Sequence, residues 1–220
     1  MRRCWSRPPS KPHTISATHR CVFVHIPKTG GSSIEAVIWP GPRTEADLWM
    51  GFVSPMRNKY QTGGLQHLCA HQIRTEVGDD RFNAYFKFAV VRNPWDKAVS
   101  QYAFMRERLD LRSFIGMADG ASFADYLKLI ARVEHVQSMR QLDFLLGSDG
   151  RMLVDFIARF ETLAVDLTRV FARLGIDCPR LPVTNRSKRE VDYRLYYDDA
   201  SRAAVARMYE ADIAYSGYEF

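Results

Sequence analysis

The hydrophobic residues of this chain are spaced in a way that predicts short buried strands alternating with helices. Apolar runs rich in β-branched and aromatic residues, which are typical of buried strands, occupy 22–26, 86–91 and 153–160. Each run is followed by a stretch that we expect to be helical, at 34–39, 95–109 and 161–174. This alternation predicts an α/β fold in which helices flank a central, mainly parallel sheet. In such sheets, ligands bind at the carboxyl ends of the strands.

The remaining stretches predict further helices and one long irregular segment. Residues 122–133 are amphipathic at helical spacing, and a C-terminal helix is expected from about 199 to 214. Gly175 follows the third helix as a C-terminal cap. Residues 43–64 show no period and carry several aromatic side chains. Such a segment can be a binding loop, or its aromatic side chains can pack over the core.

The turn after the first strand has the features of an anion-binding site. Pro27 ends the strand. Gly30 and Gly31 allow a tight turn in which the backbone can approach a ligand closely. Ser32 or Ser33 can cap the helix that follows. A helix N-terminus collects N–H groups and the positive end of the helix dipole. A plain strand-to-helix turn is the alternative reading of this stretch.

Lys28 adds a positive charge to this turn, ahead of both glycines. In the nucleotide-binding loop of ordinary ATP and GTP hydrolases, the lysine instead follows the last glycine and precedes Ser or Thr. The order in this chain therefore argues against such a hydrolase.

The turn after the second strand suits a terminal phosphate. Asn93 is a good N-cap and Pro94 a good first helical residue, so Arg92 lies between a strand end and a helix N-terminus. Ser100, about two turns later, returns to the same side of the helix. A guanidinium and a hydroxyl can together bind a phosphate. The alternative is an arginine that pairs with a surface carboxylate.

Two histidines, His67 and His71, are four residues apart and would share one face of a helix. Metal binding is one reading of such a pair, but neither an HExxH pattern nor a third ligand accompanies it. We therefore expect no metal. The basic run that includes Arg186, Ser187 and Lys188 has a solvated loop as its simplest explanation.

Length and composition narrow the class of protein. The chain has 220 residues, of which 46% are hydrophobic, and a net charge of +6. We expect residues 1–19 to be a disordered lead-in and residues 20–220 to form one domain. The charge suits an anionic cofactor or an acidic polymer without requiring either. The four cysteines are scattered without zinc spacing, and we expect reduced thiols.

The chain contains no apolar run as long as a membrane span, and its first 20 residues lack the apolar core of a signal peptide. We therefore expect a cytoplasmic protein, of bacterial origin. A transit peptide is an alternative for this basic, serine-bearing segment.

Both turns resemble motifs of one enzyme family. The string Phe-Val-His-Ile-Pro-Lys-Thr-Gly-Gly-Ser-Ser, residues 23–33, resembles the 5′-phosphosulfate loop of sulfotransferases that use 3′-phosphoadenosine 5′-phosphosulfate (PAPS). It is most similar to sulfotransferase family 2, which includes the heparan-type carbohydrate enzymes. That family more often has Thr at the position of Ser32. The string Arg-Asn-Pro-Trp-Asp-Lys-x-Val-Ser, residues 92–100, resembles the 3′-phosphate loop of the same family.

This resemblance implies a P-loop-like sulfotransferase fold and transfer of a sulfuryl group from PAPS to a hydroxyl, with release of PAP. The partner would be a hydroxyl-bearing acceptor, a glycan, and not a nucleic acid. Lys28 would stabilise the leaving phosphate and His67 would act as the base. The resemblance assigns cofactor binding to Lys28, Thr29, Gly30, Gly31, Ser32, Ser33, Arg92, Ser100, Arg186, Ser187 and Lys188.

Two other functions compete with this interpretation. A P-loop phosphotransferase, such as a nucleotide kinase, would depend on magnesium, and the order around Lys28 argues against it. A non-catalytic binder of PAP or of anionic polymers would bind PAP tightly without turnover. Replacement of His67 would then change nothing.

Overall fold

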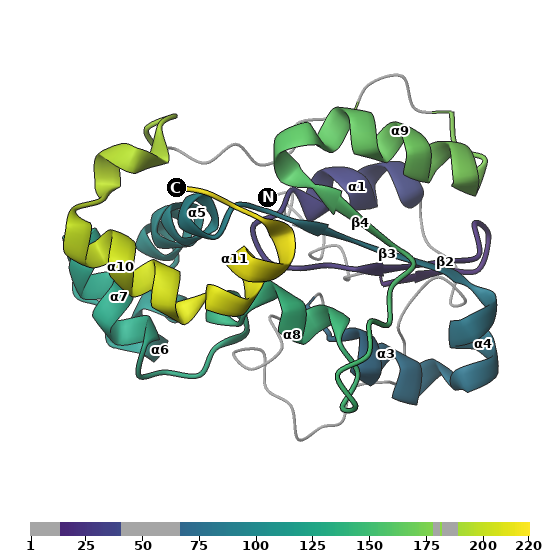
Figure 1. The fold of residues 1–220 in the computed structure, drawn as a ribbon, viewed down its shortest axis with the longest axis horizontal. Coiled ribbons are helices and arrows are strands. Elements are labelled where there is room, and N and C mark those ends of the chain that lie inside the picture. The colour runs from purple at the N-terminus through teal and green to yellow at the C-terminus, as the bar shows by residue number, and fades with distance from the viewer. Residues whose placement is uncertain (1–13, 41–66, 178–180, 182–188) are drawn as a thin grey trace, which may run out of the picture.

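The computed structural model describes residues 14–40, 67–177, 181 and 189–220. In this part of the chain, four strands form one sheet in the order β1-β2-β3-β4 (Figure 1). The strands are β1 (Ile15–Ser16), β2 (Cys21–Val24), β3 (Phe86–Val91) and β4 (Phe156–Arg159). Strand β1 is antiparallel to β2, whereas β2, β3 and β4 are parallel. The α/β fold with a mainly parallel sheet, predicted from the sequence, is therefore confirmed.

The sheet is buried on both faces, which explains why its strands are almost continuously apolar. On one face, Phe23 lies opposite Phe88 with ring centroids 5.0 Å apart. This face packs against α1 (Gly31–Ile38) and α9 (Leu163–Leu174), which lie together above the sheet in Figure 1. The opposite face turns Val24 and Ala89 toward the larger of the two hydrophobic cores that the described residues form.

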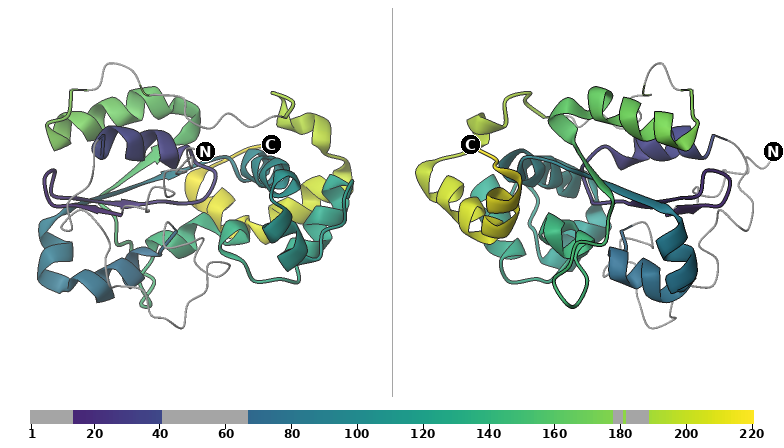
Figure 2. Two further views of the ribbon diagram at one scale, coloured as in Figure 1. Left: turned by 180° about the vertical axis from the view of Figure 1, so that it is seen from behind. Right: turned by 45° about the vertical axis from the view of Figure 1, so that its right-hand side comes forward.

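The other helices lie below the sheet or beyond the ends of its strands. Below it are α3 (Ala70–Val77), α4 (Asp79–Ala84) and α8 (Gln141–Leu145). A group of helices lies beyond the carboxyl ends of β2 and β3, as both views of Figure 2 show. This group consists of α5 (Pro94–Glu107), α6 (Leu109–Ile115), α7 (Phe123–Ile130), α10 (Asp199–Met208) and α11 (Glu210–Ser216). The described part of the chain also contains the short 3₁₀ segments η1 (Val136–Ser138), η2 (Phe160–Thr162) and η3 (Tyr193–Tyr196).

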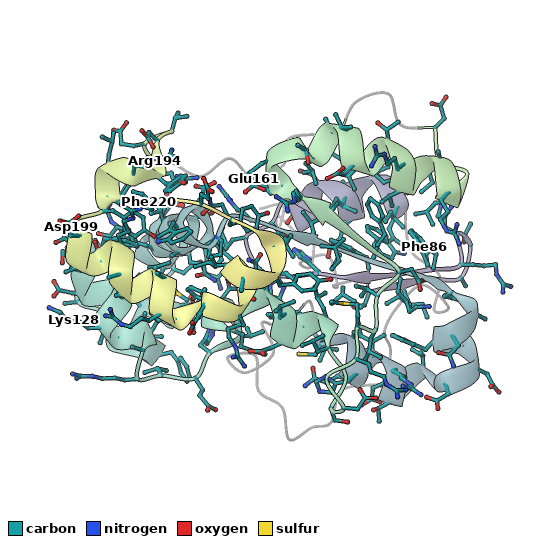
Figure 3. The ribbon with its side chains drawn as sticks, in the orientation of Figure 1. Phe86, Lys128, Glu161, Arg194, Asp199 and Phe220 are labelled. Atoms are coloured by element: carbon teal, nitrogen blue, oxygen red, sulfur yellow. The ribbon has the colours of Figure 1, made fainter. Side chains whose placement is uncertain are left out.

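The C-terminus is anchored where the sheet meets this helical group. The Phe220 ring packs edge-on against Trp95 of α5, with centroids 5.7 Å apart. Glu161 lies at the junction of β4 and α9 in Figure 3. Its carboxylate accepts from the backbone N–H of Asn93 at 2.7 Å and from the Tyr218 hydroxyl at 2.9 Å. One carboxylate therefore ties β4, the start of α5 and the end of the chain together.

Two predicted boundaries differ from the structure. Ile15 and Ser16 are buried in strand β1, so the expected lead-in of residues 1–19 ends before them. The single C-terminal helix expected from 199 to 214 is two helices, α10 and α11, which are separated at Tyr209. The break lets the Tyr209 side chain be buried, with its hydroxyl donating to the Ser138 carbonyl at 2.9 Å.

No helix in the described ranges combines the length and the apolar character needed to cross a bilayer. The irregular stretch 43–64 of the sequence prediction lies outside the described residues.

Candidate active site

A cavity of about 740 Å³ opens where the turns after β2 and β3 meet the helical group. Among the described residues, the cavity is lined by the turn after β2 (the β2 turn, residues 25–31), helix α5, His67, Gln137 and residues 189–191. Of the predicted site residues, eight line it: Lys28, Gly30, Gly31, Ser32, Ser33, His67, Arg92 and Ser100. The fold therefore brings together side chains that the sequence separates widely.

The β2 turn is built from two left-handed backbone positions. Lys28 has φ of 67° and Gly30 has φ of 85°. A left-handed conformation costs little for glycine, whereas a lysine in this region is strained by about 1–3 kcal/mol. The surrounding structure holds Lys28 there, because Arg92 Nη1 donates to its carbonyl at 2.9 Å. Strain of this kind is typical of residues placed for function.

Gly30 is the N-cap of α1, and no side chain caps this helix. The expectation that Ser32 or Ser33 would act as the cap is wrong, because both residues already lie in the first turn. Their position leaves the positive end of the helix facing the cavity, which Gly31, Ser32 and Ser33 line. This is the arrangement that binds phosphate and sulfate groups at helix N-termini.

Thr29 differs from its neighbours in this turn. Its side chain is fully buried and donates its hydroxyl hydrogen bond to the Ile26 carbonyl at 2.9 Å. The hydroxyl therefore closes the turn. Thr29 is not among the residues that line the cavity.

Gly31 is required by the close approach of His25. A Cβ at position 31 would lie 2.0 Å from Nε2 of the His25 ring. This ring is buried, and its Nδ1 lies 2.8 Å from Oε1 of Glu35 in α1. Because a carboxylate only accepts, Nδ1 carries the hydrogen in this bond. The pair holds the turn against its own helix.

His67 is buried at the cavity wall, with its Nδ1 2.8 Å from the carbonyl oxygen of His25. Since a carbonyl can only accept, Nδ1 carries the hydrogen and Nε2 carries the lone pair. Burial, with a further contribution from His25, holds the pKa of His67 well below its usual range. At neutral pH the ring is therefore an uncharged imidazole with an available basic nitrogen.

The expected pairing of His67 with His71 on one helix face is wrong. Helix α3 begins only at Ala70, so His67 precedes it, and His71 is exposed on the helix surface. Within the described ranges, no three His, Cys, Asp or Glu side chains come together as a metal site would require.

The Lys28 ammonium lies over the Phe104 ring of α5, 4.2 Å from its centroid. The pKa of this lysine is lowered to about 8, mainly by burial and further by the neighbouring charges of Arg92 and Arg189, while Glu107 opposes them. An anion that enters the cavity would raise the pKa of Lys28 and so stabilise its charged form.

Arg92 is buried at the end of β3, and its guanidinium stacks 4.0 Å from the centroid of the Phe160 ring. Its Nε and Nη2 donate to the same oxygen of Asp96, at 2.8 and 2.7 Å. Burial is the main cause that lowers the pKa of Arg92. Ser100 lies one turn beyond Asp96 on α5, also buried at the cavity wall. Arg92 and Ser100 thus both line the cavity, and Arg92 has a carboxylate partner in Asp96.

Asp96 also joins Arg92 to the C-terminal segment. Its second oxygen accepts from Nη2 of Arg189, which lines the cavity with Glu190 and Val191. The three preceding predicted cofactor residues, Arg186, Ser187 and Lys188, lie outside the described residues.

Sequence reasoning missed several members of this site: His25, Glu35, Asp96, Phe104, Gln137 and Arg189. Some of them had a local signal in the sequence. His25 stands three residues before Lys28 in the first string, and Asp96 stands four residues after Arg92, which is the spacing of a helical ion pair. Arg189 directly follows the predicted residues 186–188, and Phe104 stands one helical turn after Ser100 on α5. Gln137 has no such signal and reaches the cavity through tertiary packing.

Comparison with known proteins gave three findings. Residues 11–219 match the model of the sulfotransferase family. An uncharacterized protein of Archaeoglobus fulgidus is 31% identical over 107 residues, which cover 49% of this chain and 82% of that protein. The crystal structure of the mouse sulfotransferase SULT7A1 complexed with PAP matches with a TM-score of 0.47 and 18% identity, over 89% of this chain. The match spans 66% of the mouse protein.

Proposed function

Because the chain belongs to the sulfotransferase family, we propose that it transfers a sulfuryl group from PAPS to a hydroxyl of a carbohydrate acceptor and releases PAP. The observation that carries this proposal is the meeting of two anion-binding turns in one cavity. The first offers the N-terminus of α1 with Lys28, and the second offers Arg92 with Ser100. PAPS carries anionic groups at two ends, which fits two such turns.

The first turn is suited to the 5′-phosphosulfate. Gly31, Ser32 and Ser33 form the first turn of α1 and line the cavity, and a helix N-terminus offers N–H groups to an anion. The Ser33 N–H donates to the Gly30 carbonyl at 3.1 Å, so the proposal assigns the N–H groups of Gly31 and Ser32 to the anion. The 3′-phosphate would lie at Arg92. A guanidinium has five N–H donors, and the described contacts with Asp96 and Lys28 use three of them, one each on Nε, Nη1 and Nη2. One N–H on each terminal nitrogen is left to donate to phosphate.

The chemical step requires alignment and charge neutralisation more than covalent help from the protein. The acceptor oxygen forms a bond to sulfur while the bond from sulfur to the bridging phosphate oxygen breaks. The electron pair of the broken bond stays with the 5′-phosphate of PAP. The protonated Lys28 ammonium would stabilise the negative charge that develops on this leaving oxygen.

His67 would take the proton that the acceptor hydroxyl loses. Its Nδ1–H is held by the His25 carbonyl, so the basic Nε2 is the nitrogen available for the transfer. The backbone carbonyl of His25 therefore sets the tautomer of His67, the proposed base. A carbohydrate acceptor is supported by the similarity of residues 23–33 to the carbohydrate-type loop.

A labelled-sulfate transfer screen tests the proposal. The protein would be incubated with PAPS carrying labelled sulfate, a panel of glycans and small alcohols, and EDTA. We expect label to move to at least one carbohydrate, and Lys28→Ala to lose this transfer. Magnesium-dependent phosphate transfer from ATP, without use of PAPS, would instead identify a phosphotransferase. Tight PAP binding without transfer to any acceptor would identify a binding protein.

A further inference from the structure

His25 of the β2 turn has a ring nitrogen that the proposed mechanism does not use. The residue lines the cavity, and its Nδ1 is bonded to Oε1 of Glu35 at 2.8 Å. Among the described residues, Nε2 of the same ring has no hydrogen-bond partner. Nor is it one of the unpartnered side-chain atoms that the described fold buries completely, so Nε2 keeps accessible surface. Because the ring lines the cavity, a ligand there can reach this nitrogen.

The His25 ring packs with its face, and not with its Nε2 edge, against Gly31. A Cβ built on Gly31 would lie 2.0 Å from Nε2, 2.2 Å from Cδ2 and 2.5 Å from Cε1. An atom in line with the Nε2 lone pair would be much farther from both carbons than from the nitrogen, so the Cβ position lies over the ring. Gly31 therefore leaves open the in-plane direction along which Nε2 forms hydrogen bonds. The nitrogen is held beside the residue whose N–H is assigned to the anion.

The partner of His25 is a buried carboxylate close to this anion site. Glu35 is only 8% exposed and lies one helical turn after Gly31, in the helix whose first turn lines the cavity. Burial of an unbalanced negative charge is costly, and the charge would also repel an anion bound at the start of α1. A protonated His25 removes both penalties, because the imidazolium balances the carboxylate across a short contact.

Protonation also gives His25 a second donor. A neutral ring with its hydrogen on Nδ1 presents a lone pair at Nε2, whereas an imidazolium donates from both nitrogens. Glu35 uses the donor at Nδ1, which leaves the donor at Nε2 for a ligand. A charged donor suits phosphate, since its hydrogen bonds are about twice as strong as those of neutral donors.

We propose that His25 is an imidazolium paired with Glu35 and donates from Nε2 to the 5′-phosphate of the nucleotide. This inference rests on the proposed function, because it assumes that the 5′-phosphosulfate lies at the start of α1. The carboxylate holds the proton in the free protein, so binding of PAP adds none to His25. The two histidines then divide the work, with His25 at the leaving phosphate, together with Lys28, and His67 at the acceptor.

Calorimetric binding of two nucleotides to the wild type and to His25→Asn tests this role. The nucleotides are PAP and adenosine 3′-phosphate, which lacks the 5′-phosphate. The asparagine amide reaches only as far as Nδ1, so it can still donate to Glu35 but places no donor at the position of Nε2. We expect the affinity for PAP to fall about 10-fold to 150-fold, the effect of one hydrogen bond to a charged group. The affinity for adenosine 3′-phosphate should stay unchanged.

His135→Asn is the matched control. His135 is as buried as His25, each being 4% exposed, and it is not among the residues that line the cavity. Asparagine keeps an acceptor for the Gln137 N–H, which donates to His135 Nδ1 at 3.1 Å. This variant should leave the affinity for both nucleotides unchanged.

If His25→Asn does not fold, nitrogen NMR of the wild type bound to PAP replaces it. We expect both ring nitrogens of His25 to carry hydrogen in the complex, and an unprotonated Nε2 would overturn the proposal. Equal losses for the two nucleotides in folded His25→Asn, or no loss for either, would overturn the role of His25 alone. Absence of PAP binding by the wild type refutes the proposed function and this inference together.

Discussion

At the scale of single residues, His67 and His25 act as one unit. The carbonyl of His25 fixes the tautomer of His67, and the two rings meet edge to face with centroids 4.7 Å apart. The sequence predicted His67 as the base from its resemblance alone. It could not predict the tautomer, because this depends on a carbonyl 42 positions away in the chain.

Replacement of His67 by alanine should lower kcat by about 10²–10⁴, the usual contribution of general base catalysis. The affinity for PAP should stay close to that of the wild type, because the proposal places His67 at the acceptor and not at the nucleotide. His71→Ala is the matched control, since that histidine is exposed on α3 and should leave both quantities unchanged. A His67→Ala protein with full kcat would remove this histidine from the mechanism.

Gly31→Ala should be costly despite the small change in size. The added methyl would lie 2.0 Å from His25 Nε2, so the ring or the helix must move. Overpacking of this kind costs about 1–3 kcal/mol, and here it also displaces the carbonyl that orients His67. We expect a lower melting temperature and a lower kcat. Gly116→Ala meets no atom within 4 Å and should reduce stability without reducing kcat.

At the scale of elements, helix α5 connects the turn after β3 to the rest of the helical group. Asn93 and Pro94 predicted its start correctly, and the Asn93 side chain accepts from the Trp95 N–H at 3.0 Å. Such caps are local, so sequence spacing reveals them. The break at Tyr209 has a tertiary cause, because it lets Asp212 of α11 accept from the backbone N–H groups of Gln141 and Leu142. No local sequence pattern predicts a contact between segments so far apart in the chain.

Asn93→Ala should therefore destabilise the fold by more than an ordinary cap deletion. Loss of a cap costs about 1 kcal/mol, and this side chain also donates to the Glu219 carbonyl at 2.8 Å. We expect the free energy of unfolding, measured by urea denaturation, to fall by about 2 kcal/mol. Ser122→Ala removes the exposed cap of α7 and gives the reference value. Equal losses in the two variants would show that the link to Glu219 contributes nothing.

At the scale of the whole molecule, the cavity gathers positive charge from three distant segments. Lys28, Arg92 and Arg189 line it, and Asp96 and Glu107 partly balance them. The order of strands and helices was predictable, because it follows from apolar spacing. The ion-pair network around Asp96 was not, since Arg189 reaches it from 93 positions away.

The affinity for PAP should decline as the pH rises above about 8. In the empty cavity the pKa of Lys28 is lowered to about 8, and a bound anion raises it again. Between these two values binding takes up a proton, so the affinity can fall by up to about tenfold per pH unit. Phosphate groups with a second pKa near 6 are already fully charged there and add no slope. Calorimetric titrations should show this decline for the wild type and not for Lys28→Met.

The central claim is that one nucleotide spans both turns, with its 3′-phosphate at Arg92. The most direct measurement is calorimetric binding of PAP and of AMP, which lacks the 3′-phosphate, to the wild type and to Arg92→Ala. Arg140→Ala, which removes an exposed arginine paired with Asp143, is the control. We predict that the wild type prefers PAP and that Arg92→Ala loses about 1.5–3 kcal/mol of PAP binding while AMP binding changes little. Equal weakening of both nucleotides, or no weakening of either, would contradict the account.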